Sequence, residues 1–148
     1  MDFTAKARKI FAHDRYATEA TGIVIDQAGE HESVCSLEVG ERHCNARGAV
    51  MGGVLFTLAD FAAAVAANMN DVSAATNENS SLVTHHASLH WVSLDSTIHY
   101  LAPATGVRLT ATCKSMKHGH TTALYQTIIE NPDNGKRIAI VETTMISV

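Results

Sequence analysis

The sequence has few of the features that mark disulfide-rich, disordered or nucleic-acid-binding proteins. Its three cysteines, Cys35, Cys44 and Cys113, are an odd number and form no Cys-x-x-Cys pair, so we expect them to be reduced and packed in a cytoplasmic protein. Charged residues make up 18 % of the chain against 46 % hydrophobic residues, which indicates a globular rather than a disordered chain. The net charge is −4 and no basic run is present, so a nucleic-acid partner is not expected.

Long apolar segments are also scarce. The N-terminal stretch MDFTAKARKIFAHD has no long apolar core and is not expected to be a signal peptide. Only residues 49–69 approach the length of a membrane span, and they contain Thr57, Asp60 and two glycines. A helix that is apolar on nearly all faces also fits burial in a soluble domain, so no membrane partner is expected. With 148 residues and neither a linker nor a repeat, the chain predicts a single domain over residues 1–148.

A helical pattern within residues 45–69 dominates what the sequence does contain. Apolar side chains recur there at steps of three and four residues, the spacing of one helix face. A different face carries small residues and Asp60, the only formal charge between Gly48 and Asn70. An isolated acid on an apolar helix costs free energy unless another group uses it, so Asp60 is a candidate functional residue. The apolar face consists of Val54, Leu58, Phe61, Val65 and Met69.

The rest of the chain reads mainly as strands. Residues 3–12 predict a short amphipathic helix, residues 13–20 a connector and residues 41–50 a polar loop. Strands with a turn at 27–30 predict a hairpin, and a loop is expected over 68–81. From residue 82 onward the apolar pattern has a period of two, typical of strands. This order predicts an α+β fold with an antiparallel sheet against one long helix. The predicted strands are 22–26, 33–39, 82–101 with its core at 89–94 and 97–101, 107–113, 121–130 and 136–147.

Residues 45–62 contain the pattern Asn-x-x-Gly-x-x-Met-Gly-Gly-x(4)-Leu-x-Asp-x-Ala. With it, the chain resembles the hot-dog-fold acyl-CoA thioesterases of the phenylacetate-degradation type. FAHDRYATEATGI near the N-terminus and SLDSTIHYLAPATG later in the chain are similar to other parts of that family. The resemblance implies a hot-dog fold, in which an antiparallel β-sheet wraps around one long central α-helix, and the hydrolysis of an acyl- or aryl-CoA thioester.

The chemistry of that reaction explains why Gly52 and Asp60 would be needed in such a site. Thioester hydrolysis needs a hydrogen-bond donor at the carbonyl oxygen and a base or nucleophile at the carbonyl carbon. Unpaired amides at a helix N-terminus can supply the donor, so the Gly52 amide is a candidate donor and Asp60 a candidate base or nucleophile. Eight helical residues separate them, about 12 Å. One carbonyl cannot contact both on a single helix, but two helices packed antiparallel about a two-fold axis would bring Gly52 of one chain beside Asp60 of the other, which predicts a dimer.

The resemblance implies roles for further residues. By motif position, Gly52 provides the oxyanion amide and Asp60 the catalytic carboxylate. Asn45 helps to hold the thioester or the attacking water, Ser93 is a hydroxyl that assists water, and the CoA arm passes beside Gly119. No metal or redox cofactor is implied, coenzyme A being part of the substrate, and the expected assembly is a dimer or a dimer of dimers. The other residues assigned to substrate or CoA binding are Gly48, Met51, Gly53, His118 and His120.

Met51 is the main departure from the family pattern, which usually has histidine at this position. Methionine makes no strong hydrogen bond, so a non-catalytic acyl-CoA-binding protein remains an alternative. A hot-dog hydratase ranks lower, because those enzymes usually use a histidine early in the motif. His86 and His90, like His118 and His120, alternate as zinc ligands on a strand can, but no cysteine or carboxylate completes a ligand pattern, so we expect no metal site.

Overall fold

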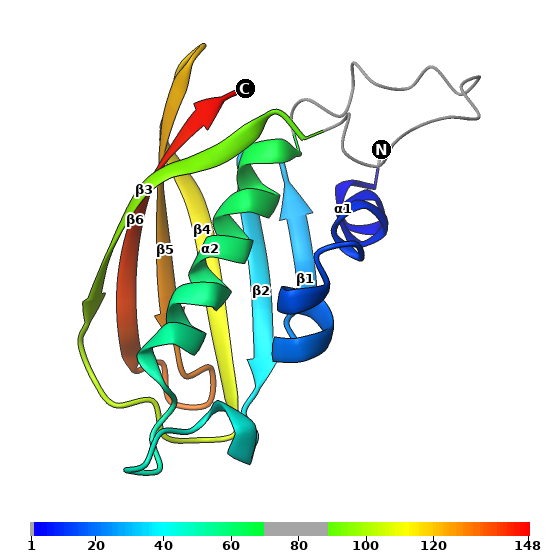
Figure 1. Cartoon of the computed structure of the whole chain (residues 1–148). Coiled ribbons are helices and arrows are strands. Elements are labelled where there is room, and N and C mark those ends of the chain that lie inside the picture. Colours follow the sequence, from blue (N-terminus) through cyan, green and yellow to red (C-terminus); the bar gives the residue numbers. More distant parts are fainter. Residues whose placement is uncertain (1, 70–88) are drawn as a thin grey trace.

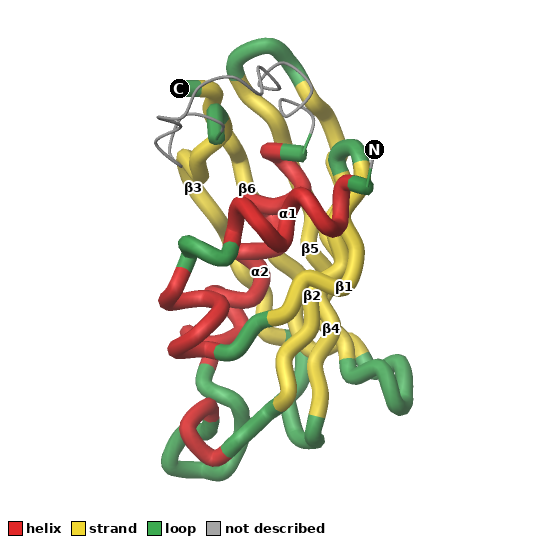
Figure 2. Tube along the Cα trace, turned by 90° about the vertical axis from the view of Figure 1, so that its right-hand side faces the viewer, coloured by secondary structure: helices red, strands yellow, loops and turns green. Residues whose placement is uncertain are grey.

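The structure is a computed structural model that describes residues 2–69 and 89–148. Figure 1 shows one long helix, α2, lying across a single sheet, with the N-terminal helix α1 beside the sheet edge formed by β1. In the view turned by 90°, β3 and β6 lie on one side of α2 and β1, β2 and β4 on the other (Figure 2), so the sheet curves around the helix. The elements are α1 (Phe3–Phe11), η1 (Tyr16–Thr21), β1 (Val24–Gly29), β2 (Glu32–Glu38), η2 (Glu41–His43), α2 (Gly52–Asn68), β3 (Trp91–Tyr100), β4 (Arg108–His118), β5 (Thr122–Glu130) and β6 (Arg137–Ser147).

The sheet has six strands in the order β1-β2-β4-β5-β6-β3, and all neighbouring strands are antiparallel. The strand that follows α2 in the chain, β3, therefore lies at the far edge of the sheet and pairs with β6 alone among the described strands. A six-stranded antiparallel sheet around one central helix confirms the predicted hot-dog fold.

Burial explains why α2 forms at the centre of the fold. Leu58, Phe61 and Val65 are buried on the predicted apolar face, and each such side chain contributes about 1.5–3 kcal/mol when removed from water. Ala62 and Ala63 are also fully buried, and their small size lets the strands approach the helix closely. Within the described ranges, no helix is long and apolar enough to cross a membrane.

The end of α2 is fastened to the start of β3 by one buried side chain. Asn68 Nδ2 donates to the carbonyl oxygens of Ala64 and Trp91, at 2.9 Å and 3.0 Å. Its Oδ1 accepts the amides of His90 and Trp91, both at 3.0 Å. Asn68 is 1 % exposed, and a buried amide must satisfy its hydrogen-bonding groups inside the protein. The side chain therefore fixes the end of the helix relative to the edge strand.

Several predicted boundaries are wrong. Residues 27–29 continue β1 instead of forming a turn, because Gly29 pairs with Glu32 and leaves a two-residue turn in which His31 has φ 60°. The predicted connector, residues 13–20, overlaps the π-helical turn η1, which ends at Thr21. The strand predicted from residue 82 begins at Trp91 within the described chain, and most of the predicted loop, together with residues 82–88, lies outside the described residues.

Candidate active site

The first turn of α2 has unpaired amides. The helix begins at Gly52 after Met51, whose side chain caps nothing. Val54 N is the first helix amide with an acceptor, the Met51 carbonyl at 2.9 Å. The amides of Gly52 and Gly53 have no hydrogen-bond acceptor among the described residues. The positive end of the helix dipole and these two N–H groups favour a negatively charged oxygen at this point.

The loop before α2 is built around Asn45. Its Oδ1 accepts the amides of Arg47 at 2.9 Å and Ala49 at 3.3 Å, while its own amide donates to the Ala49 carbonyl at 2.8 Å. Gly48 has φ 79°, a left-handed conformation that glycine adopts without strain. The carboxamide oxygen of Asn45 is therefore committed to the loop, and only its Nδ2 group remains as a donor for a ligand.

Asp60 and Ser93 lie in direct contact. Ser93 Oγ, on β3, donates to Asp60 Oδ1 at 3.0 Å. The pairing of β3 with β6 is irregular between Ser93 and Asp95, and such bulges commonly redirect a side chain near a functional site. Asp60 is exposed in the single chain, because the sheet of one chain leaves the face with Gly53 and Ala64 partly uncovered.

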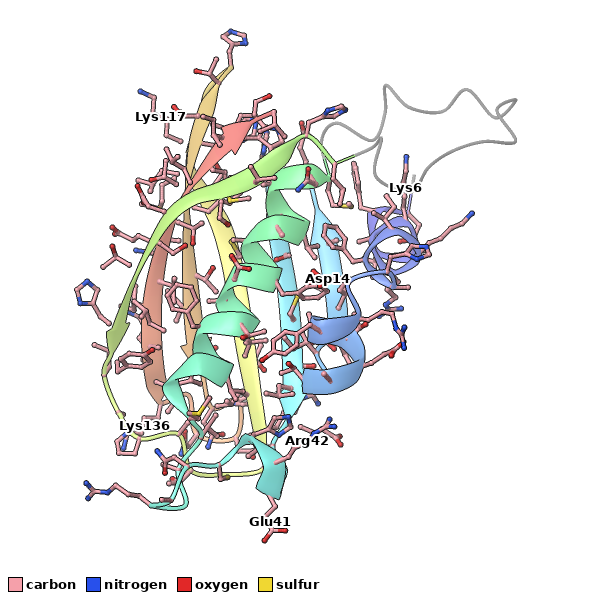
Figure 3. The ribbon with its side chains drawn as sticks, in the orientation of Figure 1. Lys6, Asp14, Glu41, Arg42, Lys117 and Lys136 are labelled. Atoms are coloured by element: carbon pink, nitrogen blue, oxygen red, sulfur yellow. The ribbon has the colours of Figure 1, made fainter. Side chains whose placement is uncertain are left out.

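Sequence reasoning did not identify Asp14 as part of this region. It lies just before η1, and Figure 3 shows it between that turn and α2. Partial burial raises the pKa of the Asp14 carboxyl, and the negative charge of Asp60 raises it further. The two carboxylates thus share one side of α2, where like charges oppose each other's ionisation.

A cavity of about 640 Å³ adjoins the start of α2. Its wall includes Asn45, Gly52 and Tyr100. The Tyr100 hydroxyl donates to the Gly52 carbonyl at 3.2 Å, and a Cβ on Gly52 would lie 2.9 Å from that hydroxyl oxygen. Position 52 therefore requires glycine for the close approach of Tyr100. Tyr100 is the aromatic residue of a Tyr-x-x-Pro turn, which was the one sequence signal that could have marked it. That signal does not reveal its partner, because Gly52 is 48 positions earlier in the chain.

A second cavity, of about 420 Å³, has a wall that includes Thr4, Glu32 and Lys114. It contains none of the predicted site residues, so the cavity beside α2 is the candidate active site.

The structure does not bring His118, Gly119 and His120 close to Gly52 within one chain. Their turn follows Lys117, which Figure 3 shows at the opposite end of the molecule from Glu41, near the start of α2. His118 Nδ1 lies 3.0 Å from the Tyr125 hydroxyl. A Cβ on Gly119 would lie 2.9 Å from the Thr122 carbonyl oxygen. The close approach of the backbone in the hairpin turn therefore accounts for glycine at this position. His120 is exposed.

The predicted alternation of histidines produces no metal centre in the part of the chain that the structure describes, where no cluster of three or more His, Cys, Asp or Glu could hold an ion. His86 lies outside the described residues. Next to His118, the ring of His31 lies at a centroid distance of 4.1 Å, and its Nδ1 is 3.1 Å from the same Tyr125 hydroxyl.

The chain is similar to several known proteins in sequence and fold. The mouse protein acyl-coenzyme A thioesterase 13 is 27 % identical over 132 residues, which cover 88 % of this chain and 81 % of that protein. The structure of the E. coli PaaI protein, from the phenylacetic acid degradation operon, superposes with a TM-score of 0.77 at 27 % identity and covers 99 % of this chain and 96 % of that one.

A thioesterase protein from Streptococcus pneumoniae, solved with coenzyme A, has the same fold. Its TM-score is 0.75 at 20 % identity, and the match covers 93 % of this chain and 96 % of that one. Residues 47–138, well over half of the chain, match the thioesterase superfamily. The chain therefore belongs to the thioesterase superfamily.

Proposed function

We propose that the protein hydrolyses an acyl- or aryl-CoA thioester to the free acid and coenzyme A. Family membership supports thioester hydrolysis, and coenzyme A is suggested by the mouse relative, named as an acyl-CoA thioesterase, and by the CoA-bound streptococcal structure. The observation that carries the proposal is the contact of Asp60 with Ser93 at 3.0 Å. Asp60 lies on α2, the helix whose first amides are unpaired among the described residues.

Each of these groups has a role in the reaction. Asp60 removes a proton from water as the water oxygen attacks the carbonyl carbon. The Gly52 amide and the Asn45 Nδ2 group donate hydrogen bonds to the developing oxyanion. When the tetrahedral intermediate collapses, the carbon–sulfur bond breaks and the departing thiolate takes the proton from Asp60. Ser93 holds the carboxylate in position. In the alternative course Asp60 attacks the carbonyl carbon directly and expels the thiolate of coenzyme A. Water then attacks the Asp60 carbonyl of the resulting anhydride, so single turnover in ¹⁸O-water would leave the label in Asp60.

The proposed site needs two chains. Gly52 and Asp60 are separated by two turns of α2, about 12 Å along its axis. Among the described strands, the edge strand β3 pairs on one side only. It carries exposed Val92 and Leu94, 44 % and 58 % accessible, and such an edge favours pairing with another chain. Antiparallel pairing of two β3 edges would align two α2 helices. The assembly is therefore a dimer, or a dimer of dimers, with two shared sites in each dimer.

The test is thiol release from a panel of acyl- and aryl-CoA esters. Asp60→Asn keeps the size of the side chain and removes the base, so we expect kcat to fall about 10²-fold or more. Asp133→Asn, an exposed acid in the β5–β6 turn, makes the same charge change and should leave turnover at the wild-type level. Equal turnover in wild type and Asp60→Asn would refute the assignment of Asp60.

Met51 supports a second candidate function, a non-catalytic acyl-CoA-binding protein. Its side chain is 51 % exposed and caps nothing at the start of α2, where the resemblance implied a histidine. This alternative predicts saturable binding of CoA esters without release of thiol. Met51→His would then be expected to create turnover, whereas for an active wild type it should change kcat only modestly.

A further inference from the structure

We propose that Arg47 recognises an anionic group of the substrate at the cavity that contains Gly52. The inference rests on the proposed function and names a residue that determines which thioesters are accepted. The resemblance assigned no role to Arg47, which lies between two motif positions, Asn45 and Gly48.

The charge of the cavity wall carries the inference. Arg47 lines the cavity of about 640 Å³ together with Asn45 and Gly52, and among the described residues it is the only charged one in that wall. The chain as a whole has a net charge of −4, so a lone cation beside the predicted oxyanion donors is not explained by a generally basic surface. The remaining described wall residues are apolar except for the Tyr100 hydroxyl.

The Arg47 guanidinium has no ion pair or hydrogen bond with any described residue. Other arginines are engaged by the protein: Arg42 donates to the Thr21 carbonyl at 3.3 Å, and Arg108 donates to Ser36 Oγ at 3.2 Å. A guanidinium presents five donors in a planar fork that matches a carboxylate or a phosphate. Arg47 therefore keeps its full capacity for an anionic ligand.

The backbone of Arg47 is held in place before any ligand arrives. Its amide donates to Asn45 Oδ1 at 2.9 Å, and the left-handed Gly48 follows it directly. Asn45 therefore has two roles: its Oδ1 fixes the backbone of Arg47, and its Nδ2 is proposed to contact the thioester. Because the loop backbone is already fixed, binding a ligand would require ordering of the Arg47 side chain but not of the loop.

The shared chemistry is an anionic oxygen group, and it has two sources in a CoA ester: the phosphates of coenzyme A, or a carboxylate at the far end of the acyl group. Three probes separate them: valeryl-CoA, glutaryl-CoA and the phosphate-free thioester valeryl-N-acetylcysteamine. Valeryl-CoA and glutaryl-CoA have acyl chains of equal length and differ in the terminal carboxylate.

The variants are Arg47→Ala, Arg47→Lys and, as a matched control, Arg15→Ala, which removes an exposed arginine of a surface ion pair outside the cavity. If Arg47 binds phosphate, Arg47→Ala raises KM about tenfold for both CoA esters and leaves the N-acetylcysteamine ester unchanged. If it binds an acyl carboxylate, only glutaryl-CoA loses kcat/KM, again by about tenfold. In either case Arg47→Lys recovers part of the loss, and Arg15→Ala matches the wild type.

The inference would be overturned if, for each of the three probes, Arg47→Ala had the same kcat/KM as the wild type. An equal loss on all three that Arg47→Lys does not relieve would overturn it as well, because that pattern would mean that Arg47 only shapes the loop. If the wild type hydrolyses none of the probes, the proposed function fails separately. The esters are then stable ligands, and the same comparison of Kd by titration calorimetry decides the role of Arg47.

Discussion

Complementation between two inactive variants tests whether the active site is shared by two chains. Asp60→Asn removes the proposed base and keeps the shape of the side chain. Asn45→Asp keeps the Oδ1 acceptor for the Arg47 and Ala49 amides but replaces the Nδ2 donor by a carboxylate oxygen that repels the oxyanion. Each variant alone should retain about 1 % of wild-type kcat or less.

The expected recovery follows from the length of α2. Because Gly52 and Asp60 are about 12 Å apart on one helix, each site combines the Asn45 end of one chain with Asp60 of the other. Random mixing of the two variants gives dimers of which half are mixed, and each mixed dimer has one intact site, so activity should recover to about a quarter of the wild type. A mixed dimer purified through two different affinity tags should reach about half.

The assay is thiol release after co-expression of the two tagged variants. A site contained within one chain predicts no recovery, because no chain in the mixture carries both Asn45 and Asp60. Purified mixed dimers that remain at the activity of the single variants would therefore refute the shared-site reasoning. Re-expression of the wild type with both tags provides the reference value.

Three further predictions concern stability and thiol reactivity. Asn68→Ala removes four hydrogen bonds and should lower the unfolding free energy in urea by about 3 kcal/mol; a loss near zero would contradict the bonding described. Burial and the charge of Asp60 raise the pKa of Asp14 in the folded protein above its usual value of 3.8. The folded state therefore holds the Asp14 proton more tightly than the unfolded state, and the wild type loses stability as the pH rises from 3.8 through the raised pKa. Asp14→Asn should accordingly have the higher urea midpoint at neutral pH, with the difference vanishing below the usual value of 3.8, and equal midpoints throughout would argue against it. Burial raises the pKa of Cys113 to about 12 and that of Cys35 as well, so a disulfide-exchange dye should titrate only Cys44 in the folded protein and all three thiols in guanidinium; two fast thiols in the native state would contradict this.

The fold could be predicted because its main helix and strands follow from the local spacing of apolar residues along the chain. The apolar spacing of α2 and the alternation in β4 to β6 each depend on neighbours a few residues apart, and tertiary packing uses the same faces. The turn at His31 was misplaced because Gln27, Ala28 and Gly29 are individually poor strand residues. Their pairing with Glu32, Ser33 and Val34 keeps them in β1, and this pairing is a tertiary effect.

The candidate site could be predicted only in part. The family resemblance named Asp60 and Ser93, yet no local pattern shows that residues 33 positions apart touch. Tyr100 was missed because its contact with Gly52 depends on the path of the sheet back to the start of α2. The assignment of His118 and Gly119 came from resemblance alone, and the neighbouring Lys117 lies at the opposite end of the molecule from Glu41 (Figure 3).

Asn68 has a consequence for how this protein can change over evolution. It joins the chain on both sides of residues 70–88, since its partners His90 and Trp91 lie more than 20 positions later. Because the bonds of this one side chain set the register at which β3 begins, they also set the position of Ser93 opposite Asp60. A substitution at Asn68 would therefore displace the Ser93–Asp60 pair although Asn68 contacts neither residue. We expect lineages that keep this pair to keep Asn68 as well.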